Sequence, residues 1–309
     1  MELESWLISA TARSLAFATP LLFAALGEII AERAGVVNLG VEGMMIVGAL
    51  AGFVAAQASG NPLVGVFVAA LAAGLAALLH AFLAVTVRAD QYVSGLALTI
   101  FGLGLTGVLG RPWQGQPLTN PFRTVTVPLL ADLPFVGPAF FQGQHLLTYL
   151  AILTALALWF LLFYSRLGIS VRSVGESPAA ADALGVDVYL IRYGCVVFGG
   201  MMAGVGGSYL SLAYRPSWSE GMTAGMGWIA LAIAIFAAWN PLRALWGAFL
   251  FGACFHLAFR LQGVLPAEFL RLLPYVATIV TLTLASLTRS GRRQGAPEAL
   301  GSPYLRGER

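Results

Sequence analysis

Residues 62–87 read PLVGVFVAALAAGLAALLHAFLAVTV and contain no Asp, Glu, Lys or Arg. About 20 apolar residues in a helix cross the hydrocarbon core of a bilayer, and only helices and closed barrels satisfy their backbone there. A run of this length is too long for a barrel strand. It therefore predicts a transmembrane helix.

The rest of the chain has the same character. Apolar residues make up 59% of the sequence and charged residues 10%, whereas a soluble domain is about one-quarter charged. The sequence predicts an all-α polytopic helical bundle, with one transmembrane domain over residues 1–288 and a disordered cytoplasmic tail over 289–309. It contains about nine candidate membrane-spanning helices, at residues 14–30, 42–58, 62–87, 92–110, 145–164, 190–212, 222–238, 243–262 and 271–288.

All 17 basic residues are arginine. Cytoplasmic loops collect basic residues, and nine helices with an internal C-terminus place eleven arginines inside and six outside. This bias predicts an external N-terminus, although one missed helix would move it inside. The absence of lysine excludes a P-loop, so any ATP must be bound by another subunit.

We find no pattern typical of an enzyme or a metal site. His80, His145 and His256 are scattered, and Cys195 and Cys254 lie in apolar runs, where they are expected to pack as small hydrophobic side chains. No nucleophile stands beside a base in the sequence. We therefore expect no catalytic residues, no bound metal and no cofactor. Residues 111–144 contain six prolines, which predicts an outer loop without regular helix.

A weak internal repeat relates the two halves of the chain. Asn61-Pro62-Leu63 and Asn240-Pro241-Leu242 each separate two apolar runs. At the same offset, Gly48 aligns with Gly227 and Ala51 with Ala230, and after a four-residue shift Tyr92-Val93 aligns with Tyr275-Val276. Matched helices would cross in opposite directions, as in the inverted repeats of transporters. Chance similarity between Gly- and Ala-rich segments is the alternative.

The inner loop 165–189 is too polar to cross the membrane. Within it, Ser177 precedes Pro178 and an alanine run that ends at Gly185, which predicts a short helix of about two turns. Its small-residue surface suits docking into a groove on another protein. An ordinary amphipathic connector is the alternative on the residues alone.

Charged and polar residues cluster between the first two predicted helices. The stretch Glu28-Ile29-Ile30-Ala31-Glu32-Arg33-Ala34-Gly35-Val36-Val37-Asn38-Leu39-Gly40-Val41-Glu42-Gly43-Met44 combines glycines with charge. We expect Glu28, Glu32 and Arg33 to lie in a solvated inner turn. Asn38 and Glu42 fit a structural or pore-side role, since intramembrane charge is costly.

Both stretches carry a resemblance. Residues 28–44 resemble a stretch typical of ABC importer permeases of the simple sugar and nucleoside branch, close to the branched-chain amino-acid permeases. Gly175-Glu176, Ala179-Ala180 and Gly185-Val186 are similar to the coupling loop of those permeases, although Glu176-Ser177 replaces a more usual Gly-Asn. The chain looks most like the shorter permease of nucleoside systems, over about residues 14–288.

The resemblance implies a permease that imports a nucleoside or simple sugar and hydrolyses no ATP itself. Its implied partners are cytoplasmic ATP-binding subunits, a second and longer permease in a heterodimer, and an extracellular substrate-binding protein, at the bacterial inner membrane. The residues expected to couple to the ATPase are Gly175, Glu176, Ala179, Ala180, Gly185 and Asp187.

Candidate residues of the substrate pathway are chosen by polarity and position. Tyr92 and Ser94 open the fourth predicted helix, and Trp228 lies in the seventh; they join Asn38 and Glu42 as candidates. Hydroxyls can bond a sugar ring, but they also bond neighbouring helices, and a lone Trp also packs between helices. A rival function is an ion-coupled secondary transporter that uses Glu28 or Glu42 as a proton relay. A membrane-embedded enzyme would need a converging catalytic set that the sequence does not display.

Overall fold

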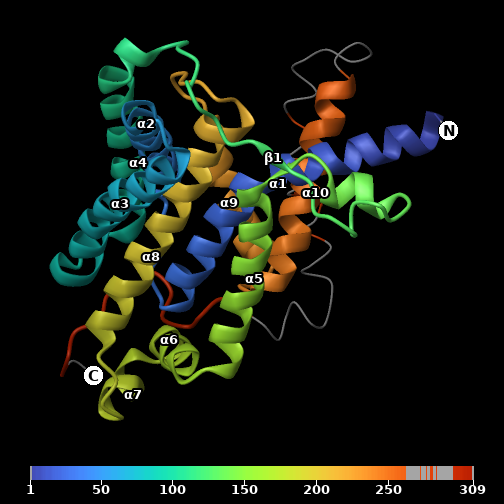
Figure 1. Ribbon diagram of the computed structural model, residues 1–309. Coiled ribbons are helices and arrows are strands. Elements are labelled where there is room, and N and C mark those ends of the chain that lie inside the picture. Colours follow the sequence, from blue (N-terminus) through green and yellow to red (C-terminus); the bar gives the residue numbers. More distant parts are fainter. Residues whose placement is uncertain are drawn as a thin grey trace.

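The computed structural model describes residues 2–261 and 295–307, with single positions 272, 276, 279, 280 and 283 between them. The described chain is a bundle of helices (Figure 1). The α-helices are α1 (Glu2–Arg33), α2 (Val41–Ser59), α3 (Pro62–Ala81), α4 (Gln91–Leu109), α5 (Leu146–Tyr164), α6 (Arg166–Glu176), α7 (Pro178–Ala183), α8 (Val188–Tyr209), α9 (Met226–Phe236) and α10 (Pro241–Arg260). Short π-helical turns η1 (Phe82–Val87) and η4 (Leu210–Tyr214) extend α3 and α8.

Among the described residues, seven helices are long and apolar enough to cross a membrane. They correspond to the first six predicted spans and the eighth. The prediction of a span over 222–238 is wrong in length: residues 220–225 form turns, and α9 has 11 residues. A helix of that length covers about 16 Å, roughly half of the hydrocarbon core. The ninth predicted span, 271–288, lies almost entirely outside the described residues.

The Pro-rich segment 111–144 forms a loop without an α-helix, as its prolines predict. It contains the 3₁₀ turn η2 (Arg111–Trp113), strand β1 (Thr124–Val125) and the π-helical turn η3 (Gly137–Phe141), and strand β2 (Gln144–His145) begins at its last residue. The two strands pair antiparallel, with Thr124 opposite His145. The loop also pairs with the segment after η4, where Gly115 N–H donates to the Trp218 carbonyl at 2.9 Å.

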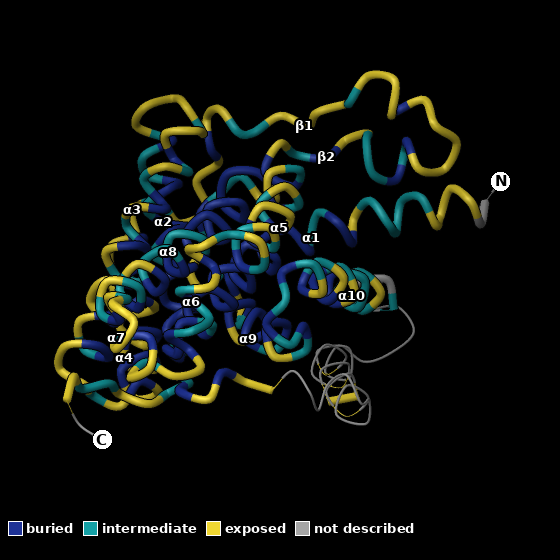
Figure 2. Tube along the Cα trace, turned by 90° about the horizontal axis from the view of Figure 1, so that it is seen from below, coloured by how far each residue is buried: buried dark blue, intermediate teal, exposed yellow. Residues whose placement is uncertain are grey.

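Helices α1, α2 and α8 form the centre of the bundle. Figure 2 shows most of their trace as dark and buried, apart from the N-terminal part of α1, which extends out of the bundle; α1 still contains the most enclosed of the candidate spans. Small residues allow their backbones to approach: a Cβ on Gly207 of α8 would lie 2.7 Å from the Met45 carbonyl carbon of α2. Such contacts are typical of membrane helices, whose association depends on close packing.

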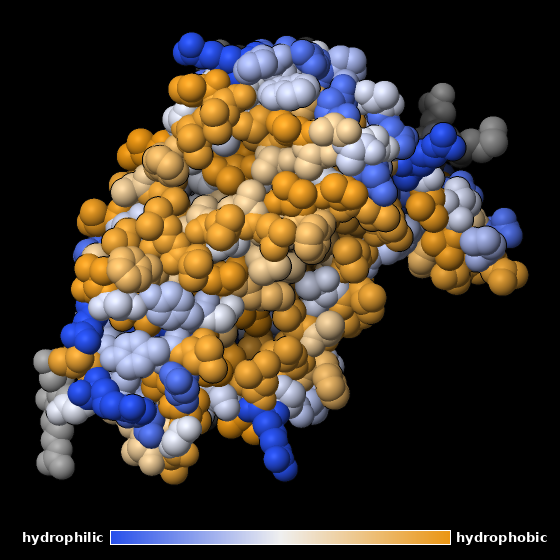
Figure 3. Space-filling view, turned by 60° about the vertical axis from the view of Figure 1, so that its left-hand side comes forward, coloured by the Kyte–Doolittle hydropathy of each residue, from blue (hydrophilic) through white to orange (hydrophobic). Residues whose placement is uncertain are grey.

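The outer surface fits a bilayer. Figure 3 shows an apolar band across the middle of one face, with hydrophilic residues concentrated toward its ends. Large apolar side chains are exposed on α3 and α4, among them Phe67, Leu75, Ile100 and Val108. A monomeric soluble protein does not expose a contiguous apolar surface of this extent. The chain is therefore a multi-pass membrane protein.

The two Asn-Pro pairs begin helices in the same way. Asn61 caps α3 by accepting from the Leu63 N–H at 2.9 Å, and Asn240 caps α10 by accepting from the Leu242 N–H at 3.0 Å. In both helices proline occupies the first turn, where its missing N–H costs nothing. These caps agree with a repeat at this position, while an inverted repeat of the whole bundle remains a prediction.

The described part of the C-terminal tail differs from the predicted disorder. Residues 295–307 lie against the α6, α7 and α8 end of the bundle, and Ala299 is 9% exposed. The Ala299 N–H donates to the Gly175 carbonyl at 2.9 Å, and the Gly301 N–H donates to the Gly35 carbonyl at 3.2 Å. The polar composition predicted disorder because it contains little apolar surface, but backbone hydrogen bonds hold this segment instead.

Candidate functional site

The turn between α1 and α2, residues 34–40, is a buried break in the helical framework. Side chains from α1 and α4 satisfy its backbone, as buried backbone polar groups require. The bonds run from Val37 N–H to Gln91 Oε1 (2.8 Å), from Asn38 N–H to Glu28 Oε1 (3.1 Å) and from Thr99 Oγ1 to the Leu39 carbonyl (2.8 Å).

Asn38 and Ser94 are both part of this buried turn. Asn38 is fully buried, and its Oδ1 accepts from the Gly40 N–H at 3.1 Å. The Ser94 hydroxyl lies 3.0 Å from His80 Nδ1, while His80 Nε2 lies 3.0 Å from the Val37 carbonyl. These side chains could bind substrate or bond neighbouring elements of the fold, and their contacts favour bonding between neighbouring elements.

Glu42 holds the start of α9. It lies in the first turn of α2, and its buried carboxylate accepts from the Thr223 hydroxyl, the Gly225 N–H (3.0 Å) and the Gly227 N–H (2.6 Å). A carboxylate at a helix N-terminus is favoured by the unpaired N–H groups and the helix dipole. Glu42 therefore joins α2 to the short helix α9, and these donors occupy both of its oxygens.

The expectation that Glu28, Glu32 and Arg33 form a solvated turn is wrong for the two carboxylates. Glu28 is 1% exposed and Glu32 4% exposed. Glu32 accepts from the Trp239 indole N–H, and half-buried Arg33 donates to the carbonyls of Trp239 and Ala238 at 3.1 Å each. The sequence could not show this because Trp239 lies more than 200 residues away. These bonds tie the end of α1 to the α9–α10 turn.

Tyr92 and Trp228 face outward instead. Tyr92, near the start of α4, is 51% exposed, and Trp228, in α9, is 38% exposed. Both helices pack against α2. The structure thus divides the predicted pathway residues into a buried group, Asn38, Glu42 and Ser94, and an exposed pair on helices that flank α2.

Sequence reasoning did not single out Gln91, Thr223 and Trp239, although each bonds a buried polar group. All three are polar or amphipathic residues next to apolar runs, and this is the signal that could have found them. Gln91 directly precedes the fourth predicted span, Thr223 is the second residue of the seventh, and Trp239 directly follows the seventh. Their roles depend on which buried groups they bond, and only the fold shows those partners.

The segment between α5 and α8 is helical for most of its length. Alongside the predicted short helix, α7, it contains α6, which the sequence did not predict and which Ser165 caps through the Gly168 N–H at 3.0 Å. Ser177 stands at the N-cap position of α7 as expected, but its side chain makes no capping bond there. Gly185 follows α7 with a φ of 84°, a left-handed conformation that glycine adopts readily.

The predicted coupling residues lie in two environments. Gly175 is buried, because a Cβ there would overlap the Arg33 carbonyl oxygen. Asp187 caps α8 by accepting from the Leu190 N–H at 2.9 Å. The exposed members are Glu176, Ala179, Ala180, Gly185 and Asp187. Leu184, at the end of α7, is 84% exposed.

Asp182 of α7 pairs with Arg306 of the C-terminal segment. Arg306 Nε lies 2.8 Å from Asp182 Oδ2, and a second guanidinium nitrogen contacts Oδ1. The hydrogen bonds from Arg306 lower the pKa of the Asp182 carboxyl, and the same contact raises the pKa of Arg306. Bidentate pairing of this kind fixes both side chains.

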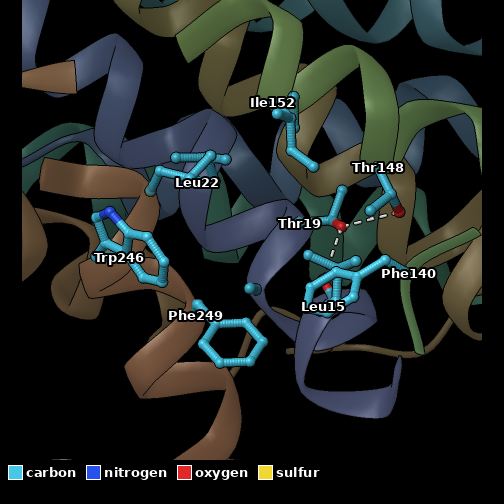
Figure 4. A pocket seen from close by; sticks show the side chains of 11 residues that line it. Leu15, Thr19, Leu22, Phe140, Thr148, Ile152, Trp246 and Phe249 are labelled. Carbon is cyan, nitrogen blue, oxygen red and sulfur yellow. Dashed lines mark hydrogen bonds between the residues drawn. The ribbon is translucent and has the colours of Figure 1, made fainter. Parts of the chain in front are cut away.

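Two cavities lie outside the buried turn. A polar cavity of about 380 Å³ lies beside α6 and is lined by Arg33, Phe163, Arg172, Glu176, Asn240, Gly295 and Ala296. An apolar cavity of about 140 Å³ lies between α1, α5, η3 and α10, where the Thr19 hydroxyl donates to the Thr148 hydroxyl at 3.0 Å (Figure 4). The predicted pathway residues line neither cavity. Within the described residues, no group of His, Cys, Asp and Glu could hold a metal ion.

Comparison with known proteins agrees with this membrane architecture. The family described as "Branched-chain amino acid transport system / permease component" matches residues 10–282. The chain belongs to this permease family. It is 42% identical, over an alignment of 332 positions that covers 99% of both chains, to TsgC13 of Haloferax volcanii, an ABC transporter permease protein assigned provisionally to glucose.

Two further relatives carry nucleoside names. The permease is 36% identical to the guanosine ABC transporter permease protein NupQ of Bacillus subtilis and 36% identical to the nucleoside ABC transporter permease protein NupC of Lactococcus lactis. Each alignment covers 96% of both chains. No solved structure matches the chain.

Membership in this family confirms that the chain is the permease component of an ABC transporter, and that ATP hydrolysis belongs to a separate subunit. It gives no support to the rival of an ion-coupled secondary transporter. Glu42, one of the two proton-relay candidates of that rival, accepts hydrogen bonds from Thr223 and Gly227 at the start of α9.

Proposed function

We propose that this permease imports a nucleoside or a simple sugar as one half of a transmembrane heterodimer in the bacterial plasma membrane. An extracellular binding protein would deliver the substrate, and two cytoplasmic ATP-binding subunits would drive transport. The similarity to permeases named for guanosine, nucleosides and glucose supports this substrate class. Both kinds of substrate contain a hydroxylated ring.

The proposal for coupling to the ATP-binding subunit rests on the exposed helix α7. It presents Ala179 and Ala180 to solvent, and the large apolar side chain of Leu184 is exposed beside them, outside the candidate membrane spans. An exposed apolar patch rimmed by charge is typical of a protein interaction site. We therefore infer that α7, with Gly175–Asp187 around it, docks into a cleft of the ATP-binding subunit.

The same end of the molecule collects basic residues, which supports a cytoplasmic position. Arg33 lies at the end of α1 against Gly175, and Arg166 and Arg172 lie in α6. Cytoplasmic loops are enriched in Arg. This orientation directs α1 inward from an external N-terminus and leaves the 111–144 loop outside, where it would meet the binding protein.

For the pathway we propose the face of α2 that lies between α4 and α9. The exposed side chains of Tyr92 and Trp228 belong to the two flanking helices. In transporters the substrate commonly passes at the interface between related halves. The second permease would complete this path, while Asn38, Glu42 and Ser94 hold its wall in place from behind.

The coupling proposal is tested with Ala180→Arg in the complete transporter, co-expressed with its partner subunits and reconstituted in vesicles. Uptake of radiolabelled guanosine and of glucose is measured with ATP supplied. We expect the variant to abolish ATP-driven uptake of whichever substrate the unaltered transporter carries, because a bulky cation cannot enter the docking cleft.

Ala58→Arg is the matched control. It introduces the same side chain at an exposed alanine in the last turn of α2, at the opposite end of the bundle, where a cation suits the helix dipole. The control should transport normally. Unchanged uptake by Ala180→Arg would contradict the docking assignment.

A further inference from the structure

We infer that the C-terminal segment 296–306, called here the strap, is a positioning element that fixes α7 relative to the end of α1. It links helices that are far apart in the sequence. Its Ala299 N–H donates to Gly175 of α6 and its Gly301 N–H donates to Gly35, which follows α1. This inference rests on the proposed role of α7 as the ATPase-docking helix.

A buried arginine holds the middle of the strap. Arg192 of α8 is 1% exposed, and its Nη1 donates to the Ser302 carbonyl at 3.0 Å. Its Nη2 lies near Gly35, at 3.0 Å from the position that a Cβ would occupy. A buried guanidinium is costly without hydrogen-bond acceptors, and the Ser302 carbonyl accepts from Nη1, while Nε and Nη2 are buried without a hydrogen-bond partner. The strap is thus built into the fold at this point.

The end of the strap reaches α7 itself. Tyr304 packs against the buried cluster of Val174, Ala181 and Val188, which joins α6, α7 and α8. Its ring centroid lies 5.9 Å from that of Tyr189. Two residues later, Arg306 forms its bidentate pair with Asp182.

These contacts matter because α7 has only six residues. A helix of that length is not stable alone, and its position must come from packing. Ala181 is its buried side chain, and Asp182 is its charged anchor to the strap. A displacement imposed on α7 by the ATP-binding subunit is therefore transmitted through the strap to Gly35 and the buried turn, in parallel with the covalent route through α6.

The experiment uses charge reversal in the complete reconstituted transporter. Asp182→Arg and Arg306→Asp are compared with the double variant Asp182→Arg/Arg306→Asp, and the amount of substrate imported per ATP hydrolysed is measured. Each single reversal should lower this ratio by about fivefold, the order expected when a surface ion pair becomes a like-charge contact. The double variant should recover most of the loss, because the pair is restored with opposite polarity and the Asp182 side chain, 16% exposed, faces the strap and not the docking surface of Ala179 and Ala180.

Glu298→Arg is the control, since it reverses an exposed charge on the same strap. It should leave the ratio unchanged. Single variants with a normal ratio, or a double variant that is no better than either single, would overturn the inference. Ala180→Arg, measured in parallel, separates the two proposals. If it abolishes uptake while the reversals do nothing, only the strap is refuted; if it transports normally, the docking assignment itself fails.

Discussion

The crossing of α2 and α8 and the surface of α7 are both composed of small residues, but their environments are opposite. At the crossing, Gly48, Gly204 and Gly207 are buried against backbone atoms of neighbouring helices. On α7, Ala179 and Ala180 are exposed, and Gly185, which follows α7, has nothing within 4 Å of the position of a Cβ. Small residues therefore serve internal packing in one region and leave room for a partner in the other.

The largest effect on stability is expected at the crossing of α2 and α8. A Cβ on Gly207 would overlap the Met45 carbonyl oxygen, so Gly207→Ala must force α2 and α8 apart. We expect a loss of about 3 kcal/mol in the free energy of unfolding, as in other overpacked cores. Denaturation of the purified protein in mixed detergent micelles measures it.

Gly194→Ala is the control within the same helix, because nothing lies within 4 Å of its Cβ position. Alanine is the better helix former, so this variant should be as stable as the original protein or up to about 1 kcal/mol more stable. Equal stability of the two variants would mean that α2 and α8 do not cross in close contact.

A smaller effect should separate two carboxylates in the same two regions. Glu42 is 3% exposed and accepts from the α9 turn, whereas Glu176, at the end of α6, is exposed. Glu42→Ala leaves the N–H groups of Gly225 and Gly227 without acceptors, and we expect a loss of about 2 kcal/mol. Glu176→Ala should change stability little. The same denaturation experiment checks both, and a stable Glu42→Ala variant would show that the α9 turn holds without this carboxylate.

The features of the fold that could be predicted from the sequence are those decided by local interactions. Long apolar runs such as 62–87 predict spans because the bilayer leaves helices as the practical solution. The Asn-Pro pairs predict the starts of α3 and α10 because capping is a local interaction. Exposure of the alanines on α7 follows from a short polar loop that cannot enter the membrane. In each case the decisive physics acts within about 20 residues.

Where sequence prediction failed, the missing information was a distant partner. Residues 220–225 are no more polar than a helix permits, and hydropathy does not reveal that Glu42 accepts from the Thr223 hydroxyl and the Gly225 N–H. Glu32 was expected in solvent because Trp239 could not be placed beside it. The tail was expected to be disordered because composition does not show that Gly35 and Gly175 offer carbonyls to it.

The smallest predicted effect tests the exposed end by changing pH. Arg306 lowers the pKa of Asp182 in the folded protein, so the ion pair stabilises strap attachment above the unfolded pKa of about 3.9. That contribution is lost as the pH falls through the lower, folded-state pKa. A spin label at Leu305→Cys, with Cys195 and Cys254 replaced by alanine, reports strap mobility. Mobility should stay constant from about pH 8 to pH 5 and rise only in stronger acid, where the Asp182 carboxylate is protonated.

Arg306→Gln removes the cation, so its label should be more mobile at neutral pH and show no such transition. The α2–α8 crossing contains no titrating pair of this kind among its described contacts, and a label at Ala58→Cys on α2 should not respond. A rise in mobility near neutral pH would mean that another group controls the strap, and the ion pair would then not be its anchor to α7.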